Sequence, residues 1–219
     1  SFIMHNTVKN LIYIEELIKS KANDDELAKI IAVSKTFPIE NVLPLIEHGH
    51  LHYGENKVQE ALEKWSDIKL KNNTIKLHLI GRLQTNKVKF ALRIFDYIHS
   101  LDSEKLAIKI SEEQKKQEKK PKIFIQVNIG NEDQKSGINK DNLIDFYKFC
   151  KNLNLDIIGT MCIPPNDDNT EKYFSEMNDL NKEFNFKELS MGMSGDYLEA
   201  IRYNATYIRV GSKIFGSRT

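Results

Sequence analysis

The chain has 219 residues, of which 40% are hydrophobic, so it can bury a core and does not have the composition of a disordered protein. Its 32 basic and 31 acidic side chains leave a net charge of +1, which argues against a nucleic acid as the main partner. No apolar run approaches the ~18 residues of a membrane span, and we expect no signal peptide and no membrane partner. Cys150 and Cys162 form no C-x-x-C pair, so we expect reduced thiols in a cytoplasmic protein.

Short apolar runs rich in β-branched residues alternate along the chain with segments of helical periodicity. The first segment is an amphipathic helix over residues 8–18. Eight strands are then predicted, at residues 30–35, 51–54, 77–81, 97–101, 123–128, 157–162, 189–192 and 207–211. Helical spacing fills the intervals, near residues 39–46, 58–65, 87–93, 106–110, 143–153, 173–184 and 197–201.

Strands that are each separated by a helix are typical of parallel sheets with right-handed crossovers. Eight of them predict an α/β fold, a (β/α)8 TIM-type barrel with an extra N-terminal helix. An open doubly wound sheet is the alternative, but it normally carries a glycine-rich turn after its first strand, where this chain has Ser34-Lys35-Thr36. We see no linker and predict one domain over residues 1–219, with a helical extension at 1–29 and the barrel at 30–216.

The carboxyl ends of barrel strands carry the functional groups. Lys35 follows the first strand, and partial desolvation there would lower the pKa of its amine and make it a Schiff-base nucleophile. A lysine that only extends into solvent is the plain alternative. The turns Ser194-Gly195 and Gly211-Ser212 follow strands seven and eight, and backbone N–H groups with two hydroxyls in such turns bind phosphate. A lysine opposite a phosphate cradle indicates a phosphorylated aldehyde, and pyridoxal 5′-phosphate (PLP) fits this description.

Arg209 lies inside the eighth predicted strand, two residues before Gly211. A buried arginine needs an acceptor, and the pyridine nitrogen of the cofactor could supply it. Because arginine keeps its own proton, such a ring stays unprotonated and is a poor electron sink. A carboxylate inside the barrel is the alternative partner.

Short motifs occur in order along nearly the whole chain, from residue 32 to residue 216. They are A-V-S-K-T (32–36), Y-G-E-N-K-V-Q-E (53–60), H-L-I-G-R-L-Q-T-N-K (78–87), Q-V-N-I (126–129), K-S-G (135–137), G-T-M (159–161), L-S-M-G-M-S (189–194), R-V-G-S (209–212) and I-F-G (214–216). In this set and order, they resemble the pyridoxal phosphate homeostasis proteins, a PLP-binding family related to the N-terminal barrel of alanine racemase.

The resemblance implies a fold-type III PLP barrel in which Lys35 carries the cofactor as an internal aldimine. The remaining implied contacts are Ser194, Gly211 and Ser212 to the phosphate, Arg209 to the pyridine nitrogen, Asn56 beside the ring, and Val33, His78 and Met191 in the pocket wall. Three positions depart from the family pattern. Ser212 stands where threonine is usual, Gly195 where aspartate is frequent, and Asn204-Ala205 where the turn usually contains glycine.

The resemblance also implies a role in intracellular PLP homeostasis. An amino-acid racemase needs a base on each face of the cofactor, and in alanine racemases the second base comes from another domain. Here the chain ends at Thr219, and neither Tyr53 nor Tyr203 can be assigned that position. We therefore expect a monomeric PLP carrier or regulator that supplies apo PLP-dependent enzymes. A small PLP-dependent racemase is the alternative.

A metal-dependent barrel hydrolase is a third possibility. It rests on His48, His50 and His52, because alternate residues of a strand share one face. However, His48 directly precedes Gly49, so we expect it at the end of a helix and not in a strand. No carboxylate–histidine motif follows them, and we expect no metal site.

Overall fold

The computed structural model describes residues 3–21, 26–133 and 136–217. Eight parallel strands close into a barrel in chain order, and β1 pairs with both β2 and β8. The strands are β1 (Lys29–Val33), β2 (His52–Glu55), β3 (Lys76–Leu79), β4 (Tyr97–Leu101), β5 (Lys122–Gln126), β6 (Asp156–Met161), β7 (Glu188–Ser190) and β8 (Tyr207–Val210). The predicted (β/α)8 barrel is therefore confirmed, and the open-sheet alternative is wrong because the last strand, β8, pairs with β1 and closes the sheet.

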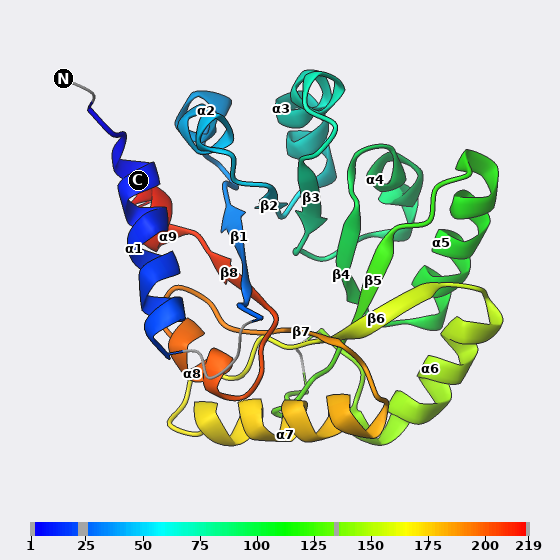
Figure 1. Ribbon diagram of the computed structural model, residues 1–219. Helices are drawn as coiled ribbons and strands as arrows, with labels where there is room; N and C mark the ends of the chain where they lie inside the picture. The colour runs from blue at the N-terminus through cyan, green and yellow to red at the C-terminus, as the bar shows by residue number, and fades with distance from the viewer. Residues whose placement is uncertain (1–2, 22–25, 134–135, 218–219) are drawn as a thin grey trace.

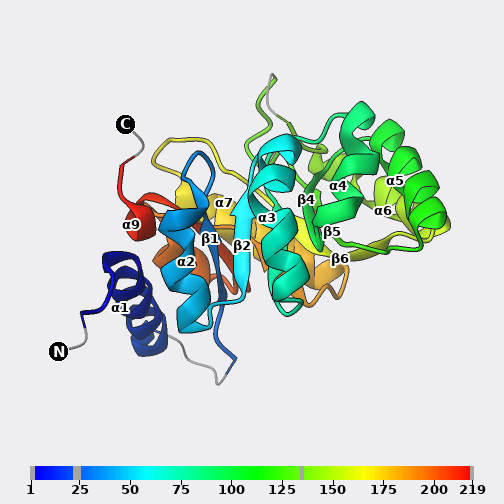
Figure 2. The same cartoon turned by 90° about the horizontal axis from the view of Figure 1, so that it is seen from above.

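Helices surround the strands, and Figures 1 and 2 show α2 to α5 following one another around the outside. The helices are α1 (Asn6–Lys21), α2 (Ile39–His48), α3 (Val58–Lys71), α4 (Val88–Ile94), α5 (Glu104–Gln117), α6 (Leu143–Asn152), α7 (Thr170–Glu183), α8 (Tyr197–Arg202) and α9 (Ser212–Phe215). Two 3-10 turns, Thr85–Lys87 and Lys140–Asn142, precede α4 and α6. Local signals explain several ends: Gly49 ends α2 in the left-handed conformation, and the Ser103 hydroxyl accepts from the amide of Leu106 at the start of α5.

The N-terminal helix α1 packs beside the C-terminal helix α9 (Figure 1). The side-chain amide of Asn10 donates to the carbonyl of Ile214 over 2.8 Å. Buried apolar residues such as Leu11 and Ile14 anchor α1 to the core. The first helix thus holds α9, which starts where the barrel's last strand ends.

Side chains of each strand alternate between the helix-facing side and the barrel interior. Ile30 and Ala32 join the large core between strands and helices, whereas Ile31 and Val33 face a smaller inner cluster with Phe124. This alternation decides which residues can reach a ligand at the end of the barrel.

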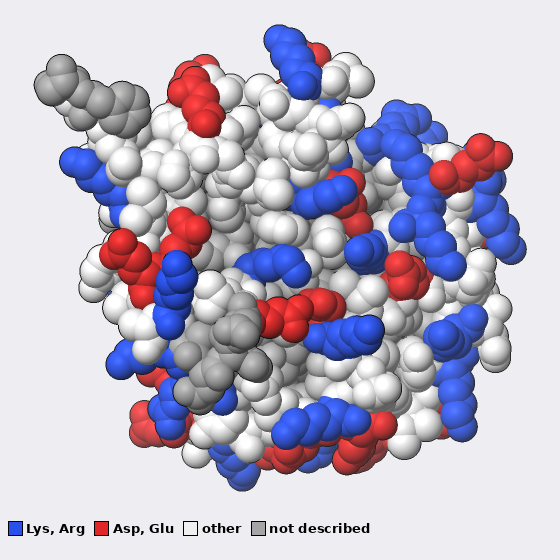
Figure 3. Space-filling view, viewed as in Figure 1, with Lys and Arg blue, Asp and Glu red and all other residues white. Residues whose placement is uncertain are grey.

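Basic and acidic side chains both occur across the face shown in Figure 3, in keeping with the balanced composition. Within the described residues, every helix is too short or too polar to cross a lipid bilayer.

Candidate functional site

A cavity of about 370 Å³ lies at the carboxyl ends of the barrel strands. Small-ligand pockets in proteins typically measure about 300–1,000 Å³, so its size suits a compact cofactor. Seven of the nine predicted binding residues line it: Val33, Lys35, Asn56, Ser194, Arg209, Gly211 and Ser212. The chain therefore brings together groups that are up to 179 positions apart in sequence, from Val33 to Ser212 (212 − 33).

Lys35 stands two residues beyond the end of β1 and is half-buried. Because Ile31 and Val33 face the barrel interior, the strand's alternation directs Lys35 toward the same side. The strand ends earlier than predicted, at Val33 rather than at residue 35. Thr36, which follows, has a φ of 68°, a left-handed conformation that a β-branched residue rarely adopts without support from its surroundings.

Helix α3 supplies that support. The amide of Thr36 donates to the Glu60 carboxylate over 2.6 Å, and the Lys64 ammonium donates to the Ser34 carbonyl over 2.6 Å. The Ser34 hydroxyl donates to the buried carboxylate of Glu55. The backbone on both sides of Lys35 is thereby fixed to one helix.

Glu55 is the centre of this support. Its carboxylate accepts from the Lys64 ammonium and from the Trp65 indole N–H, each over 2.9 Å, and it is fully buried. Burial raises the pKa of this carboxyl, and the neighbouring Lys64 charge acts in the opposite direction. A buried carboxylate with these partners fixes local geometry more than it adds net stability.

The predicted phosphate site joins the ends of β7 and β8. The amide of Gly211 donates to the Ser194 hydroxyl over 3.3 Å, so the two turns are in direct contact. Ser212 is the exposed first residue of α9, and the amides of Ile214 and Phe215 in that short helix donate to the Gly211 carbonyl over 3.0 and 2.9 Å. The ring of Phe215 stacks on that of Phe37 with centroids 5.3 Å apart, which ties α9 to the loop that carries Lys35.

Arg209 is 3% exposed and lies on the inner side of β8. Its NH1 donates to the Ser190 hydroxyl over 2.7 Å, and its NH2 donates to the Cys162 carbonyl over 2.9 Å. Burial lowers the pKa of the guanidinium, and an arginine side chain keeps its charge in proteins. The ion pairs found among the described residues do not include Arg209, so the carboxylate partner considered above is absent from that part of the chain.

Asn56 follows β2 and is half-buried at the cavity. Gly81, which follows β3, packs against it: a Cβ at Gly81 would lie 2.4 Å from the Asn56 carbonyl oxygen. Only glycine allows the two strand ends to approach this closely.

Two predicted wall residues, His78 and Met191, lie outside the cavity lining. His78 is fully buried deeper in the barrel, where its ring stacks on Tyr97 at 4.1 Å between centroids. It lies two residues before Ile80, which does line the cavity, so the prediction chose the right strand face but the wrong depth. Met191 belongs to the core between strands and helices, so its side chain lies on the opposite side of the barrel wall.

Eight lining residues are not among the predicted binding residues: Ile80, Gly81, Arg82, Gln126, Ser136, Ile163, Met193 and Gly195. Arg82 and Gln126 stand at the carboxyl ends of strands, and this position was a signal that could have selected them. Ser136 and Ile163 lie in loops whose approach to the cavity no local pattern reveals. Lys135, in the K-S-G motif, lies outside the described residues.

The departures from the family pattern have structural explanations at two positions. Asn204 has a φ of 71°, and asparagine tolerates this left-handed turn better than most side chains, so it replaces glycine at small cost. A Cβ at Gly195 would meet no atom within 4 Å, so the space for a larger side chain is present.

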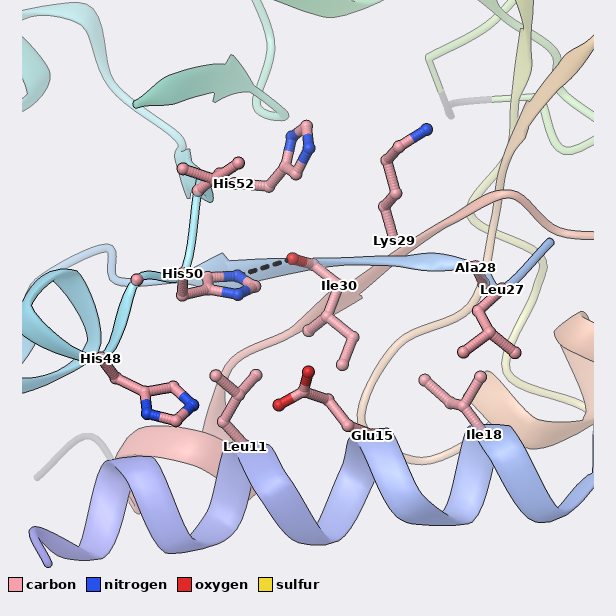
Figure 4. A pocket seen from close by; sticks show the side chains of 12 residues that line it. Leu11, Glu15, Ile18, Leu27, Ala28, Lys29, Ile30, His48, His50 and His52 are labelled. Atoms are coloured by element: carbon pink, nitrogen blue, oxygen red, sulfur yellow. Dashed lines mark hydrogen bonds between the residues drawn. The ribbon is translucent and has the colours of Figure 1, made fainter. Parts of the chain in front are cut away.

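The three histidines of the hydrolase alternative do not converge (Figure 4). His48 ends α2, as the sequence predicts, His50 lies before β2, and His52 is in that strand, so the three histidines do not share one strand face. His50 contacts the Ile30 carbonyl over 2.9 Å, whereas His52 contacts His78 in the barrel interior. In the described residues, no group of three or more histidine, cysteine, aspartate or glutamate side chains is arranged so that it could hold a metal ion.

The chemistry of the lining fits a phosphorylated heteroaromatic aldehyde. Lys35 offers an amine for the aldehyde, Arg209 a buried donor for a ring nitrogen, and Ser194 and Ser212 hydroxyls for a phosphate. None of the described residues that line this cavity is an aspartate or a glutamate, so the lining favours a ligand with negative charge.

The fold and this cavity define a class of protein, the (β/α)8 barrels with ligand groups at the carboxyl ends of the strands, and known proteins narrow that class. The family model described as "Alanine racemase, N-terminal domain" matches residues 15–219. A pyridoxal phosphate homeostasis protein of Pasteurella multocida is 36% identical over 216 residues, covering 94% of this chain and 93% of the relative. One from Schizosaccharomyces pombe is 32% identical over 219 residues, covering 94% and 90%. The chain belongs to the family of pyridoxal phosphate homeostasis proteins, within the alanine racemase N-terminal domain class.

Solved structures agree with this assignment. PipY of Synechococcus elongatus, solved with PLP bound, has a TM-score of 0.85 and 30% identity, covering 96% of this chain and all of that one. The form of PipY without PLP has a TM-score of 0.87 at 29% identity. An alanine racemase of Clostridium difficile shares the fold, with a TM-score of 0.74 at 16% identity, and the match covers 57% of its length.

Proposed function

We propose that this protein binds PLP in the cavity at the carboxyl end of its barrel, holds it covalently on Lys35, and serves intracellular PLP homeostasis. The observation that carries the proposal is the convergence of Lys35, Arg209 and the Ser194–Gly211 contact on one cavity. Its support is the family membership and the PLP-bound structure of PipY. The aldehyde of PLP supplies reversible covalent chemistry with an amine.

Each residue has a defined part in this proposal. Lys35 attaches the cofactor, and α3 holds the turn that presents it. Ser194, Gly211 and Ser212 bind the phosphate, and Asn56 and Val33 border the ring. Arg209 donates to the ring nitrogen and leaves it unprotonated, which weakens carbanion stabilisation and therefore disfavours efficient catalysis.

The racemase alternative has less support. The Tyr53 hydroxyl donates to the His50 carbonyl over 2.8 Å and its ring packs on Trp65, so it lies on the helix-facing side of β2. Tyr203 follows α8 and is absent from the cavity lining. No described lining residue is a tyrosine, so the described residues of the cavity offer no such second base opposite Lys35.

We place the protein in the cytoplasm, where its free, buried thiols Cys150 and Cys162 remain reduced. Burial raises the pKa of both to about 12, so they are poor nucleophiles at neutral pH.

A transfer experiment tests the carrier role. The PLP-loaded protein, mixed with an apo PLP-dependent enzyme, should restore its activity faster than the same amount of free PLP in the presence of a PLP-sequestering protein. Lys35→Ala, treated identically, should give no advantage over free PLP. Equal reactivation by the loaded wild type and by free PLP would contradict a carrier.

Prolonged incubation with L-alanine or L-serine separates the alternatives. We expect no more D-isomer than an equal concentration of free PLP forms, measured by chiral chromatography. Multiple turnovers per protein molecule, abolished by Lys35→Ala, would instead establish a racemase.

A further inference from the structure

Five polar side chains form a continuous hydrogen-bonded column through the barrel interior. His52 Nδ1 lies 2.9 Å from His78 Nε2, and His78 Nδ1 lies 2.8 Å from His99 Nε2. His99 Nδ1 lies 2.9 Å from the Ser190 hydroxyl, which accepts from Arg209 NH1 over 2.7 Å. His78, His99 and Ser190 are fully buried. Barrel interiors are usually filled by branched apolar residues, so a polar column here calls for an explanation.

The charge of Arg209 sets the direction of the column. A guanidinium has only donors, so Ser190 must accept from it, and the serine proton is then available to His99 Nδ1. A neutral His99 that accepts at Nδ1 donates from Nε2 to His78, and His78 donates from Nε2 to His52 by the same logic. Every link then has one donor and one acceptor. The opposite direction would leave Ser190 accepting twice, with no described acceptor for its own proton.

The surroundings keep the histidines in the neutral form that this direction needs. Burial is the largest cause that lowers the pKa of His78 and of His99, and Arg209 adds to it at His99. Burial lowers the pKa of His52 to about 4, and His50, Lys29 and Lys76 add to that effect while Asp96 opposes it.

The column connects the two ends of the barrel. Arg209 lines the cavity that holds Lys35. His52 lines a separate cavity of about 550 Å³ at the amino-terminal ends of the strands, together with Lys29, Lys76 and Lys122. Hydrogen bonds in such chains polarise one another, so a fixed direction at one end reinforces the donors along the whole column.

We propose that the His52–His78–His99–Ser190 column is a positioning element of the cofactor site, which holds the guanidinium of Arg209 in one orientation toward the bound ring. This inference rests on the proposed function. Ser190 and the Cys162 carbonyl engage NH1 and NH2, so the guanidinium cannot rotate without breaking two buried hydrogen bonds. Loss of this positioning should speed PLP release by about tenfold, which corresponds to about 1.4 kcal/mol.

The first test needs no cofactor. Imidazole nitrogen-15 NMR of the wild type at pH 7 should show His52, His78 and His99 as neutral Nε2–H tautomers, with the exposed His48 as a reference that exchanges between tautomers. An Nδ1–H tautomer at His78 or His99 would overturn the column's direction.

The second test compares variants at Ser190, where the column meets Arg209. Ser190→Ala removes the hydroxyl, and Ser190→Thr retains it. We expect the alanine variant to release PLP about tenfold faster and to change the absorbance spectrum of the bound cofactor. The threonine variant should stay close to wild type, which a purely structural role of Ser190 would not predict. His48→Gln, on an exposed histidine outside the column, should match wild type.

A third variant distinguishes the loss of hydrogen bonds in the column from a loss of folding. His99→Phe keeps the ring that stacks on Phe124, with centroids 4.3 Å apart, but removes both hydrogen bonds. If wild type binds PLP and both Ser190→Ala and His99→Phe, folded by circular dichroism, release it at the wild-type rate with an unchanged spectrum, the column does not position the site. If wild type itself does not bind PLP, the proposed function and the positioning role fail together, and only the tautomer pattern would stand.

Discussion

At the scale of single residues, two glycines beside the cavity differ in the space available for a side chain. Gly81 lets the end of β3 lie against the backbone of Asn56, where a Cβ would come within 2.4 Å of a carbonyl oxygen. Gly195 lines the cavity, and a Cβ at this position would meet no atom within 4 Å. A side chain at Gly81 would therefore clash with backbone, whereas a side chain at Gly195 would not.

Alanine substitutions test this difference. We expect Gly81→Ala to lower the free energy of unfolding by roughly 1–3 kcal/mol, because backbone must shift, and to weaken PLP binding through Asn56. Gly195→Ala, the matched control, should stay within about 0.5 kcal/mol of wild type. Urea unfolding measures both. Equal stability of the two variants would contradict the close approach at Gly81.

At the scale of elements, helix α3 is the part that holds Lys35 in place. Glu60 and Lys64 on α3 bind the backbone on either side of Lys35, and Trp65 fixes the Glu55 carboxylate behind it. Beside the predicted phosphate site, α1 holds α9 in place through the hydrogen bond from the Asn10 side-chain amide to the Ile214 carbonyl. The cavity is thus built by loops, but helices on the outside of the barrel set its shape.

Lys64→Met tests the support from α3. Removing the ammonium leaves the buried Glu55 carboxylate without its charge partner, which costs roughly 3 kcal/mol, and frees the Ser34 carbonyl. We expect lower stability in urea and a smaller yield of borohydride-fixed PLP on Lys35. Lys71→Met, at the exposed end of the same helix, should change neither quantity. A Lys64→Met protein with wild-type PLP attachment would show that α3 does not position Lys35.

At the scale of the whole molecule, burial of neutral histidines makes stability depend on pH. His50 and His52 have pKa values lowered to about 4, mainly by burial, against 6.5 in the unfolded chain, and burial also lowers the pKa values of His78 and His99 well below 6.5. Between these values the unfolded state binds more protons, so stability is fully present above pH 6.5 and is lost as the pH falls toward 4. The raised pKa of Glu55 has the opposite effect, because it favours the folded state as the pH falls. Glu55 is a single group, however, whereas four histidines have lowered pKa values.

Unfolding in urea at pH 7.5 and pH 5 checks this balance. Each histidine with a pKa near 4 should lower the free energy of unfolding by roughly 2 kcal/mol at pH 5 relative to pH 7.5. His50→Gln should reduce the difference between the two pH values by about that amount, and His48→Gln, on an exposed residue, should leave it unchanged. Identical stability of the wild type at both pH values would contradict the burial of neutral histidines.

The sequence predicted the barrel because its repeating unit is local: each strand and helix carries its own period and caps. Lys35, Ser194 and Gly211 could be proposed for the same reason, since each lies within four residues of the carboxyl end of a strand. His78 and Met191 show the limit, because depth in the barrel and the side of the wall depend on closure and register. The histidine column could not be predicted, because it needs the inner faces of β2, β3, β4, β7 and β8 together.

The most direct test of the account is borohydride reduction of the wild type and Lys35→Ala after incubation with PLP, followed by peptide mass spectrometry and visible absorbance. We predict one phosphopyridoxyl group per wild-type chain, located on Lys35, and no stoichiometric attachment to the variant. Equal modification of both proteins, or modification of the wild type at another lysine, would contradict the assignment of Lys35 and of the cavity around it.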